Sequence, residues 1–303
     1  MTPSRPSPDL PGLTVIIPLK DDPRILSAIA SLPKDGIEIL AVFNNNPSAN
    51  LQSAVQKTGA RVLCVDTAKL SVARNEGIRH SRSDSILFLD SDCRAGEDCV
   101  GAVQAALKHF PVVKPLLVYD AHSWETRITA KVRQYTTVRT SLPLLPLAFR
   151  KDIVEAVGGY YFDERLAWGE DWDFAERIAA THPMIPLLEE ATIVHEALSF
   201  RDDLRSAAKI GNGRSLQVEH GLQPARSLVR DVLMAGEHRK FAAVMKTSGI
   251  GAALYHTLGW RLAYKVGYYR SRRPMRVQSL TETAMRWKSG VESDRSVAHS
   301  DNC

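Results

Sequence analysis

The chain has 303 residues, of which 44% are hydrophobic and 24% charged, and its formal net charge is +5. This composition is typical of soluble globular proteins and excludes a chain that is disordered throughout. The length allows one large domain, or one domain with an appendage. The mild positive excess does not indicate nucleic acid as a partner. No run of about 18 uncharged apolar residues predicts a membrane-spanning helix.

The two ends of the chain differ in composition from the rest. Residues 1–12 are rich in proline and have no apolar core behind a basic start, so we expect a disordered tail and no secretory signal. Residues 289–303 are expected to form a second disordered tail. The four cysteines, Cys64, Cys93, Cys99 and Cys303, form no CxxC pair. This pattern predicts free thiols in a reducing compartment, and therefore a cytoplasmic protein.

Short apolar strands alternate with helical patterns over the first third of the chain. We expect strands at Leu13–Pro18, Ile37–Phe43 and Arg61–Val65. Helices are expected between and after them, at Arg24–Leu32, Leu51–Thr58 and Ser71–Arg79, with Ser71 as the N-cap of the last helix. The next apolar strand lies within Ser85–Asp92. Strands that alternate with helices in this way predict a parallel, doubly wound sheet.

The middle of the chain is less regular. We expect a helix at Gly96–Phe110, a strand at Val112–Tyr119, a short helix before Gly158 and a strand pair or edge strand at Ile185–His195. For Ala121–Thr140 both a helix and a mobile loop remain open. Beyond Ser199 helical patterns dominate. We therefore expect one domain over residues 13–200 and a helical extension over residues 201–288.

The helical extension is basic and rich in aromatic residues. Residues 261–288 contain eight Lys or Arg and one acid, Glu282. Aromatic side chains such as Trp260, Tyr264 and Tyr268 are interleaved with them. Such a segment suits the surface of an anionic membrane. The alternative is a helix that packs its aromatic residues on the domain and leaves a solvated basic face.

The strand in Ser85–Asp92 ends on two carboxylates one residue apart. Side chains alternate along a strand, so Asp90 and Asp92 can leave its end on the same side. Ligands of open α/β sheets bind at the carboxyl ends of the strands. Two carboxylates there make a hard oxygen site for Mg²⁺ or Mn²⁺, which phosphate oxygens usually complete. The alternative is that the aspartates only cap the following loop.

Further polar residues follow the other strands. Arg74 stands early in its helix, where it could bind a phosphate or a base edge, or form a surface salt bridge. Asn44 and Asn46 end the second strand and suit a nucleobase edge, or simply form the turn before Pro47. Glu170 and Asp171 open a helix, where carboxylates favour the N-terminus, and could also serve as a general base.

Four clusters in a fixed order resemble the family 2 glycosyltransferases. They are Val15-Ile16-Ile17-Pro18, Val42–Asn46, Ala73–Ile78 with Leu89–Asp92, and Val157–Tyr160 with Phe162–Glu164 and Gly169–Asp173. The resemblance covers roughly residues 13–200. It implies the GT-A fold, a Rossmann-like, mostly parallel sheet flanked by helices, followed here by the helical extension. An aspartate often stands near Asn44 in that family and pairs with uracil, so the base is open here.

The resemblance also implies roles for single residues. Asp92 and His195 would bind Mn²⁺ or Mg²⁺, and Asp90 would face the metal or the ribose. Asp171 would be the general base, with Glu170 positioning the acceptor. Trp168 and Trp172 could stack on a sugar ring or belong to the core. The expected nucleotide-binding residues are Pro18, Lys20, Asn44, Asn46, Arg74 and Asp90.

These expectations combine into one main hypothesis. The chain would be an inverting, metal-dependent glycosyltransferase that uses a UDP-sugar first, or a GDP- or dTDP-sugar second. The acceptor would be a lipid-linked or cell-envelope glycan at the inner membrane face, or a soluble small molecule or peptide. A sugar-nucleotide pyrophosphorylase is disfavoured because the loop Leu19–Asp22 has no glycine. A catalytically silent nucleotide-binding or scaffold protein is the alternative of another class.

Overall fold

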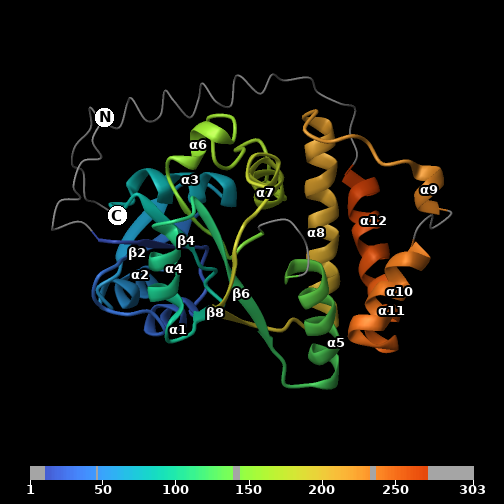
Figure 1. The fold of residues 1–303 in the computed structure, drawn as a ribbon, viewed down its shortest axis with the longest axis horizontal. Helices are drawn as coiled ribbons and strands as arrows, with labels where there is room; N and C mark the ends of the chain where they lie inside the picture. The colour runs from blue at the N-terminus through green and yellow to red at the C-terminus, as the bar shows by residue number, and fades with distance from the viewer. Residues whose placement is uncertain (1–10, 46, 139–143, 233–236, 272–303) are drawn as a thin grey trace.

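The computed structural model describes residues 11–45, 47–138, 144–232 and 237–271. Its centre is an eight-stranded sheet in the order β3-β2-β1-β4-β7-β6-β8-β5, with helices on both faces (Figure 1). The strands are β1 Thr14–Leu19, β2 Glu38–Asn44, β3 Arg61–Val65, β4 Ser85–Phe88, β5 Cys93–Ala95, β6 Val112–Asp120, β7 Ala148–Arg150 and β8 Leu187–Glu196. Neighbouring strands are parallel, except that β7 is antiparallel to β4 and β6, and β5 is antiparallel to β8.

Two apolar layers enclose the sheet because its central strands are apolar on both faces. In β1, Val15 and Ile17 belong to one core cluster, whereas Ile16 belongs to the other. This split follows from the alternation of side chains along a strand. The first layer contains α1 (Ile25–Ala30), α2 (Ala49–Gln56) and α4 (Cys99–Leu107). The second contains α3 (Leu70–His80), α6 (Ile153–Ala156) and α7 (Glu170–Thr181). The predicted α/β sheet flanked by helices is confirmed.

The remaining helices form a separate column beside the sheet (Figure 1). They are α5 Trp124–Arg133, η1 Gln134–Val138, α8 Phe200–Glu219, α9 Leu228–Val232, α10 Glu237–Ser248, α11 Ile250–Leu254, η2 Tyr255–Trp260 and α12 Arg261–Ser271, where η marks a π-helix. Trp260 and Tyr268 are buried in this column. Most aromatic side chains of the extension thus pack inward, as the second of the two alternatives expected. Among the described helices, none has the length and apolar character needed to cross a bilayer.

Glycines allow α8 and α12 to pack in close contact. A Cβ atom on Gly211 would lie 2.0 Å from the carbonyl oxygen of Tyr264, and one on Gly267 would lie 1.9 Å from that of Ala208. Such distances are far inside van der Waals contact, so any side chain at either position would push the helix axes apart. The helical extension therefore depends on these two glycines for its packing.

Several sequence expectations are corrected by the structure. Ser71 is not an N-cap: α3 begins at Leu70, and the Ser71 hydroxyl donates to the carbonyl of Leu166 at 2.9 Å. Residues 121–140, left open between helix and loop, contain helix α5. The segment Ile185–His195 holds one strand, β8, and its edge partner β5 was not predicted. Cys93 and Cys99 are free, but Cys64 is disulfide-bonded. The prediction of free thiols is therefore wrong for Cys64, because sequence spacing alone does not reveal which thiols meet.

We predict that Gly267→Ala lowers the free energy of unfolding by about 1–3 kcal/mol, because the added methyl overlaps the Ala208 carbonyl. Gly101→Ala is the matched control. Gly101 also lies inside a helix, but a Cβ atom there meets nothing within 4 Å. Alanine at this position should therefore raise the free energy of unfolding by roughly 0.5–1 kcal/mol. Denaturant unfolding of both variants measures this. Equal stability of the Gly267→Ala variant and the wild type would contradict the close packing.

Candidate functional site

The first part of the site lies where β4 ends. Asp90 and Asp92 follow β4, and the backbone turns so that the Cys93 amide donates to the Asp90 carbonyl at 3.0 Å. The chain then runs back as β5, antiparallel to β8, with Cys93 directly opposite His195. This pairing brings a carboxylate and an imidazole that are about a hundred residues apart in sequence to one edge of the sheet.

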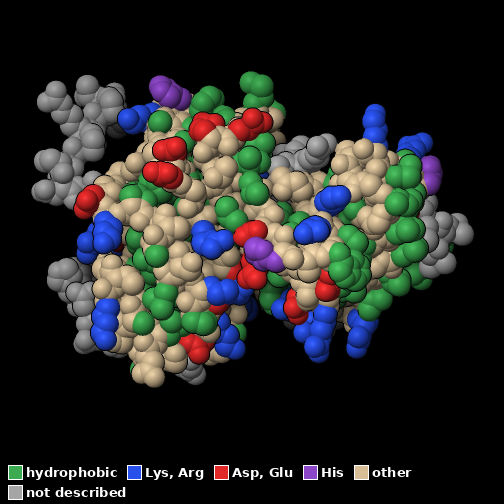
Figure 2. Space-filling view, turned by 90° about the horizontal axis from the view of Figure 1, so that it is seen from below, with side chains coloured by type: hydrophobic (Ala, Val, Ile, Leu, Met, Phe, Trp, Pro, Cys, Tyr) green, Lys and Arg blue, Asp and Glu red, His purple; other side chains and the backbone are tan. Residues whose placement is uncertain are grey.

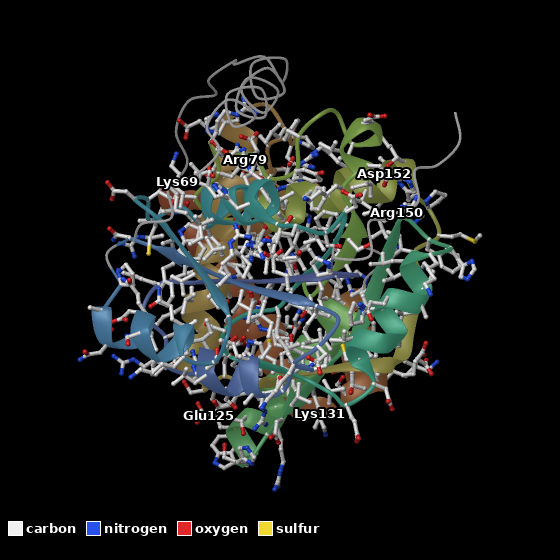
Figure 3. All side chains as sticks on the ribbon, turned by 90° about the vertical axis from the view of Figure 1, so that its left-hand side faces the viewer. Lys69, Arg79, Glu125, Lys131, Arg150 and Asp152 are labelled. Atoms are coloured by element: carbon white, nitrogen blue, oxygen red, sulfur yellow. The ribbon has the colours of Figure 1, made fainter. Side chains whose placement is uncertain are left out.

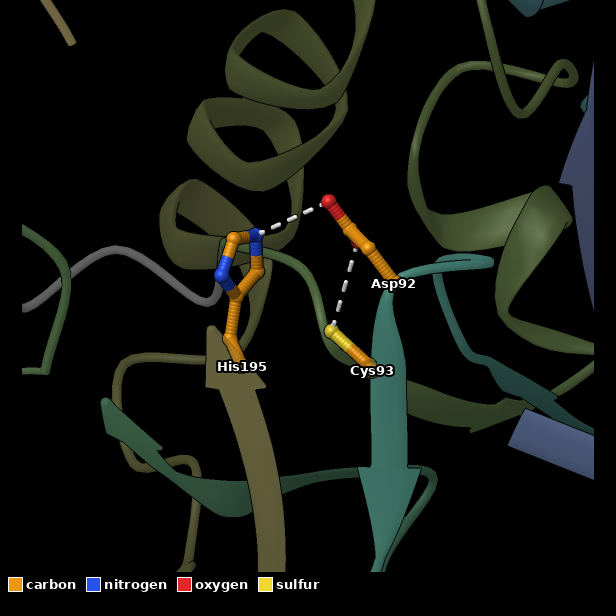
Figure 4. A group of neighbouring side chains, drawn as sticks. All are labelled: Asp92, Cys93 and His195. Atoms are coloured by element: carbon orange, nitrogen blue, oxygen red, sulfur yellow. Dashed lines mark hydrogen bonds and ion pairs between the residues drawn. The ribbon is translucent and has the colours of Figure 1, made fainter. Parts of the chain in front are cut away.

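Asp92 and His195 face each other across the end of this strand pair. The Asp92 Oδ2 atom lies 3.5 Å from His195 Nε2 (Figure 4). The other ring nitrogen, Nδ1, lies 2.5 Å from the Glu196 carbonyl oxygen, to which it can only donate. With Nδ1 donating to that carbonyl, the neutral form of the ring would present the lone pair of Nε2 toward Asp92, which is the tautomer that a metal ligand requires. A carboxylate and a neutral imidazole at this spacing fit a divalent ion such as Mn²⁺.

Cys93 is the third side chain of this group (Figure 4). Its Sγ atom lies 3.9 Å from Asp92 Oδ1. Burial and the negative charges of Asp90 and Asp92 raise the pKa of this thiol well above its ordinary value. Sulfur also suits softer metals than Mn²⁺ or Mg²⁺, which prefer oxygen ligands. The donor set for an ion is therefore Asp92 and His195, with Asp90 beside them.

Sequence reasoning missed two residues that contact the loop carrying Asp92. Asp22 and Arg24 follow β1, and Asp22 Oδ2 accepts a hydrogen bond from the Ser91 hydroxyl at 3.0 Å. Arg24 pairs with Asp22 at 2.8 Å and lies 3.6 Å from Asp92. The available signal was their position after a parallel strand that ends at the same edge as β4. Arg24 is a cation beside the carboxylate that would bind the metal.

The second part of the site is the start of α7. Gly169 has a φ of 79°, a left-handed conformation that glycine adopts without strain, and it turns the chain into the helix. Glu170 and Asp171 are the first two helical residues, as the sequence indicated. Glu170 is buried, while Asp171 is half-buried and accepts from the Trp172 amide at 2.8 Å. Only the second carboxylate is therefore partly open to a substrate.

Arg74 connects the two parts. Its guanidinium is 4% exposed, with Nη1 at 2.5 Å from Glu170 Oε1 and Nη2 at 3.9 Å from Asp90 Oδ1. The next residue of α3, Asn75, exchanges hydrogen bonds with the backbone of Phe162. Lys69 and Arg79, which mark the two ends of α3 in Figure 3, both bond to Glu164. Helix α3 thus fixes the segment that leads into α7.

The carboxylates of both parts influence each other. Desolvation raises the pKa of Asp90, although 43% of its side chain is exposed; Arg74 and His195 oppose this shift, while the charges of Asp92 and Asp171 add to it. Burial also raises the pKa of Glu170 to about 7, against the attraction of Arg74 and with the repulsion of Asp171. Asp92 and Asp171 therefore lie within Coulomb range of the same group, which is what a shared site requires.

The space-filling view looks into this site. Acidic and histidine side chains gather in the hollow between the sheet on the left and the helical column on the right (Figure 2). Trp168 is 41% exposed, and Lys209 Nζ of α8 lies 4.8 Å from its ring centre. Trp172 is half-buried, and its indole nitrogen donates to Glu176 at 2.9 Å. Of the two tryptophans, Trp168 is the more open to a ligand.

The other predicted nucleotide-binding residues stand at the same edge of the sheet. Pro18 and Asn44 are buried at the ends of β1 and β2, and Lys20 is exposed just after β1. Asn46 lies outside the described residues. Their binding roles stay predictions.

Comparison with known families bears on the identity of the site. The model of the family described as glycosyl transferase family 2 matches residues 14–162. This segment, just under half of the chain, resembles glycosyl transferase family 2. The mostly parallel sheet with helices on both faces is the architecture that this resemblance implies. The matched segment contains β1, the Asp90 and Asp92 turn, and Phe162, but ends before Glu170 and His195.

Solved structures give a further likeness of fold. The structure of TarS residues 1–349 from S. aureus has 14% sequence identity and a TM-score of 0.48, over 85% of this chain and 91% of that chain. The same TarS fragment in complex with UDP-GlcNAc has 13% identity and a TM-score of 0.49, and in complex with UDP 16% and 0.47, with the same coverage. No curated protein matches the chain significantly.

We predict a pH dependence of stability that comes from Glu170. Its folded-state pKa of about 7 lies above the ordinary value of 4.5, so folding favours the protonated carboxyl. The stabilising contribution is complete below about pH 4.5 and is lost as the pH rises through 7. The Glu170→Gln variant should lose this slope, a difference of about 1–3 kcal/mol between pH 5 and pH 8.

Denaturant unfolding at several pH values measures the effect. Glu97→Gln, at an exposed carboxylate, is the control and should keep the slope of the wild type. If the Glu170→Gln variant and the wild type lose stability in parallel between pH 5 and pH 8, the burial of Glu170 does not govern its protonation.

Proposed function

We propose that the chain is a metal-dependent, inverting glycosyltransferase that moves a sugar from a nucleotide-diphospho-sugar, first a UDP-sugar, to an acceptor hydroxyl. The observation that carries the proposal is that Asp92, His195 and Asp171 all lie within Coulomb range of Asp90. The charges of all three act on Asp90. One site thus combines a cation-binding group with a separate carboxylate that could act as a base.

The donor side is formed by the ends of the parallel strands. Asp92 and His195 would hold a Mn²⁺ or Mg²⁺ ion, with Asp90 facing the ion or the ribose. A bound ion would act as a Lewis acid that neutralises the charge of the leaving diphosphate. Arg74 is committed to Asp90 and Glu170, so its role on this side is to keep Asp90 in place. Lys20, exposed after β1, is a further cation that could contact the donor, besides Arg24 near Asp92.

The acceptor side is formed by the start of α7. Glu170 is buried against Arg74 at 2.5 Å and cannot approach a substrate without leaving that ion pair. Asp171 is half-buried, so it is the carboxylate that can take the proton of an acceptor hydroxyl. The acceptor oxygen then forms a bond to the anomeric carbon while the bond from that carbon to the diphosphate oxygen breaks on the opposite face. This single displacement inverts the anomeric centre.

The acceptor class follows from weaker observations. Trp168 is exposed beside Glu170 and offers a flat face on which a sugar ring can stack. A glycan, either lipid-linked or in the cell envelope, would use such a platform. A soluble small-molecule or peptide acceptor is the alternative, and Trp168 would then contact whatever group carries the hydroxyl. We place the reaction in the cytoplasm, with a lipid-linked acceptor presented at the inner membrane face.

We predict that Asp171→Asn lowers the rate of sugar transfer by about 10²–10⁴-fold, because the amide cannot accept the proton. Binding of UDP with Mn²⁺ should persist, since Asp171 is not among the donor-side ligands. Release of free nucleoside diphosphate from a panel of nucleotide sugars measures turnover, and calorimetry measures binding. The control is Asp152→Asn. Asp152 follows β7 at the opposite end of β4, because Arg150 pairs with Ser85 (Figure 3). Full turnover by the Asp171→Asn variant would refute the assignment of the base.

We predict that Asp92→Ala and His195→Ala each weaken Mn²⁺ binding by about tenfold or more, because each removes one of two facing ligands. The shift of the melting temperature with increasing Mn²⁺, in the presence of UDP, measures this. His109→Ala, at an exposed histidine after α4, should behave as the wild type. An unchanged Mn²⁺ response in both site variants would place the ion elsewhere, or show that none is used.

A further inference from the structure

A row of exposed aliphatic side chains runs along the outer helix of the extension. The helix is continuous from Ile250 to Ser271 through α11, η2 and α12. The row consists of Ile250, Leu254, Leu258, Leu262 and Val266, which are 58, 46, 61, 59 and 43% exposed. We call it the aliphatic ridge. Hydrophobic side chains are conspicuous on the right-hand side of Figure 2, where these helices lie.

The π-helix in the middle of this helix aligns the ridge. Residues four apart in an α-helix are offset by about 40° around the axis, so a row of five would wind far around it. Between Tyr255 and Trp260 the helix has the wider turn of a π-helix, which rotates less per residue. This reduces the drift and keeps Leu254, Leu258 and Leu262 on nearly one side. The irregularity therefore produces a continuous apolar face.

The opposite face of the same helix is firmly packed. Trp260 is buried, and the guanidinium of Arg133 on α5 lies 6.0 Å from its ring centre. Arg261 pairs with the buried Glu237 at 2.7 Å. Gly267 lies against α8. The helix therefore cannot rotate to bury the ridge without breaking these contacts, and the ridge remains on the surface.

The charged residues of the segment that carries the ridge have one sign. Residues 238–271 contain no Asp or Glu, but they contain six Lys or Arg, of which Arg239, Lys240, Lys246 and Arg270 are exposed. Arg270 continues the four-residue spacing of the ridge beyond Val266, whereas Lys246 lies near the end of α10, just before the turn at Gly249 that leads into the ridge. The acid nearest in sequence, Glu237, is buried and paired with Arg261. The ridge is thus an apolar face with basic residues at both ends.

These charges decide between two occupants. A second copy of the chain would pack ridge on ridge about a two-fold axis. In an antiparallel pair Lys246 would meet the partner's Arg270, and in a parallel pair like residues would meet, with no acid in residues 238–271 to compensate. A narrow row of five side chains is also small beside the roughly 800 Å² per partner of a stable interface. An anionic lipid surface offers both an apolar layer and negative charge.

We propose that the aliphatic ridge docks on the surface of an anionic membrane, with its aliphatic side chains in the boundary region and the basic residues at the headgroups. The aromatic residues of the extension, which suggested a membrane contact in the sequence, do not form this surface because they are packed inside. The contact goes beyond the proposed sugar transfer and does not depend on it. It would hold the site beside a lipid-borne acceptor.

The test is co-sedimentation of the full chain with vesicles of phosphatidylcholine alone or of phosphatidylcholine with phosphatidylserine. The wild type should bind only the second kind, and less at high salt. Leu258→Gln with Leu262→Gln should weaken binding about tenfold or more. Lys246→Glu with Arg270→Glu should have a similar effect through the charges. The matched control is Met184→Gln with Leu187→Gln, at exposed apolar residues away from the ridge, which should bind as the wild type.

Three outcomes would overturn the proposal. One is a wild type that does not bind the phosphatidylserine vesicles. Another is ridge variants that bind as tightly as the wild type. The third is self-association of the wild type, seen by analytical ultracentrifugation, that the leucine variants abolish while no vesicle binding occurs. Binding of UDP with Mn²⁺ in the absence of vesicles, measured on the same samples, separates these outcomes from a failure of the proposed transfer reaction and reports that each variant is folded.

Discussion

The ion pair between Arg74 and Glu170 is the interaction on which the site depends. Both side chains are nearly fully buried, so each depends on the other for a hydrogen-bond partner, and Glu170 is charged only above its raised pKa of about 7. Removing one partner of a buried pair typically costs about 3–5 kcal/mol, because the other charge is left alone. Arg74 also reaches Asp90 and lies over the Phe162 ring at 5.4 Å. A single guanidinium thus joins the end of β4 to the start of α7, and it sets where a donor and an acceptor could meet.

The sequence predicted the parts of the site whose position follows from local rules. Alternating apolar strands and helices predict a parallel sheet, and the ends of parallel strands share one edge. Asp90 and Asp92 lie at that edge for this reason. Glu170 and Asp171 begin a helix as carboxylates at a helix N-terminus do. For Arg74 the sequence left both a ligand-binding role and a salt bridge open, because an arginine early in a helix suits either. The structure shows the ion pair, but within the protein and not at the surface.

The parts that the sequence did not predict depend on contacts distant in the chain. The three residues of β5 are too few to carry a strand pattern, and only their pairing with β8 brings Asp92 to His195. The links of Asp22 and Arg24 to the β4 loop likewise join two different strand ends. In the extension, the spacing of the aromatic residues could not distinguish a packed face from an exposed one. The π-helix, which the sequence did not predict, aligns the exposed aliphatic residues of this helix on one side.

The helical extension is structurally coupled to the start of α7, which carries Glu170 and Asp171. A Cβ atom on Gly213 of α8 would lie 2.5 Å from the Trp168 carbonyl oxygen, and Gln217 of α8 donates to the Gly169 carbonyl at 2.9 Å. The turn that presents Glu170 and Asp171 is therefore held from outside by α8, which is itself packed on α12 through glycines. The donor side is formed by strand ends and the acceptor side by a helix that rests on the extension. A change in the extension would then shift Trp168 and Asp171 while Asp92 and His195 stay in place. Under the proposed function, acceptor preference could therefore vary without loss of the donor site, because the two sides have different supports.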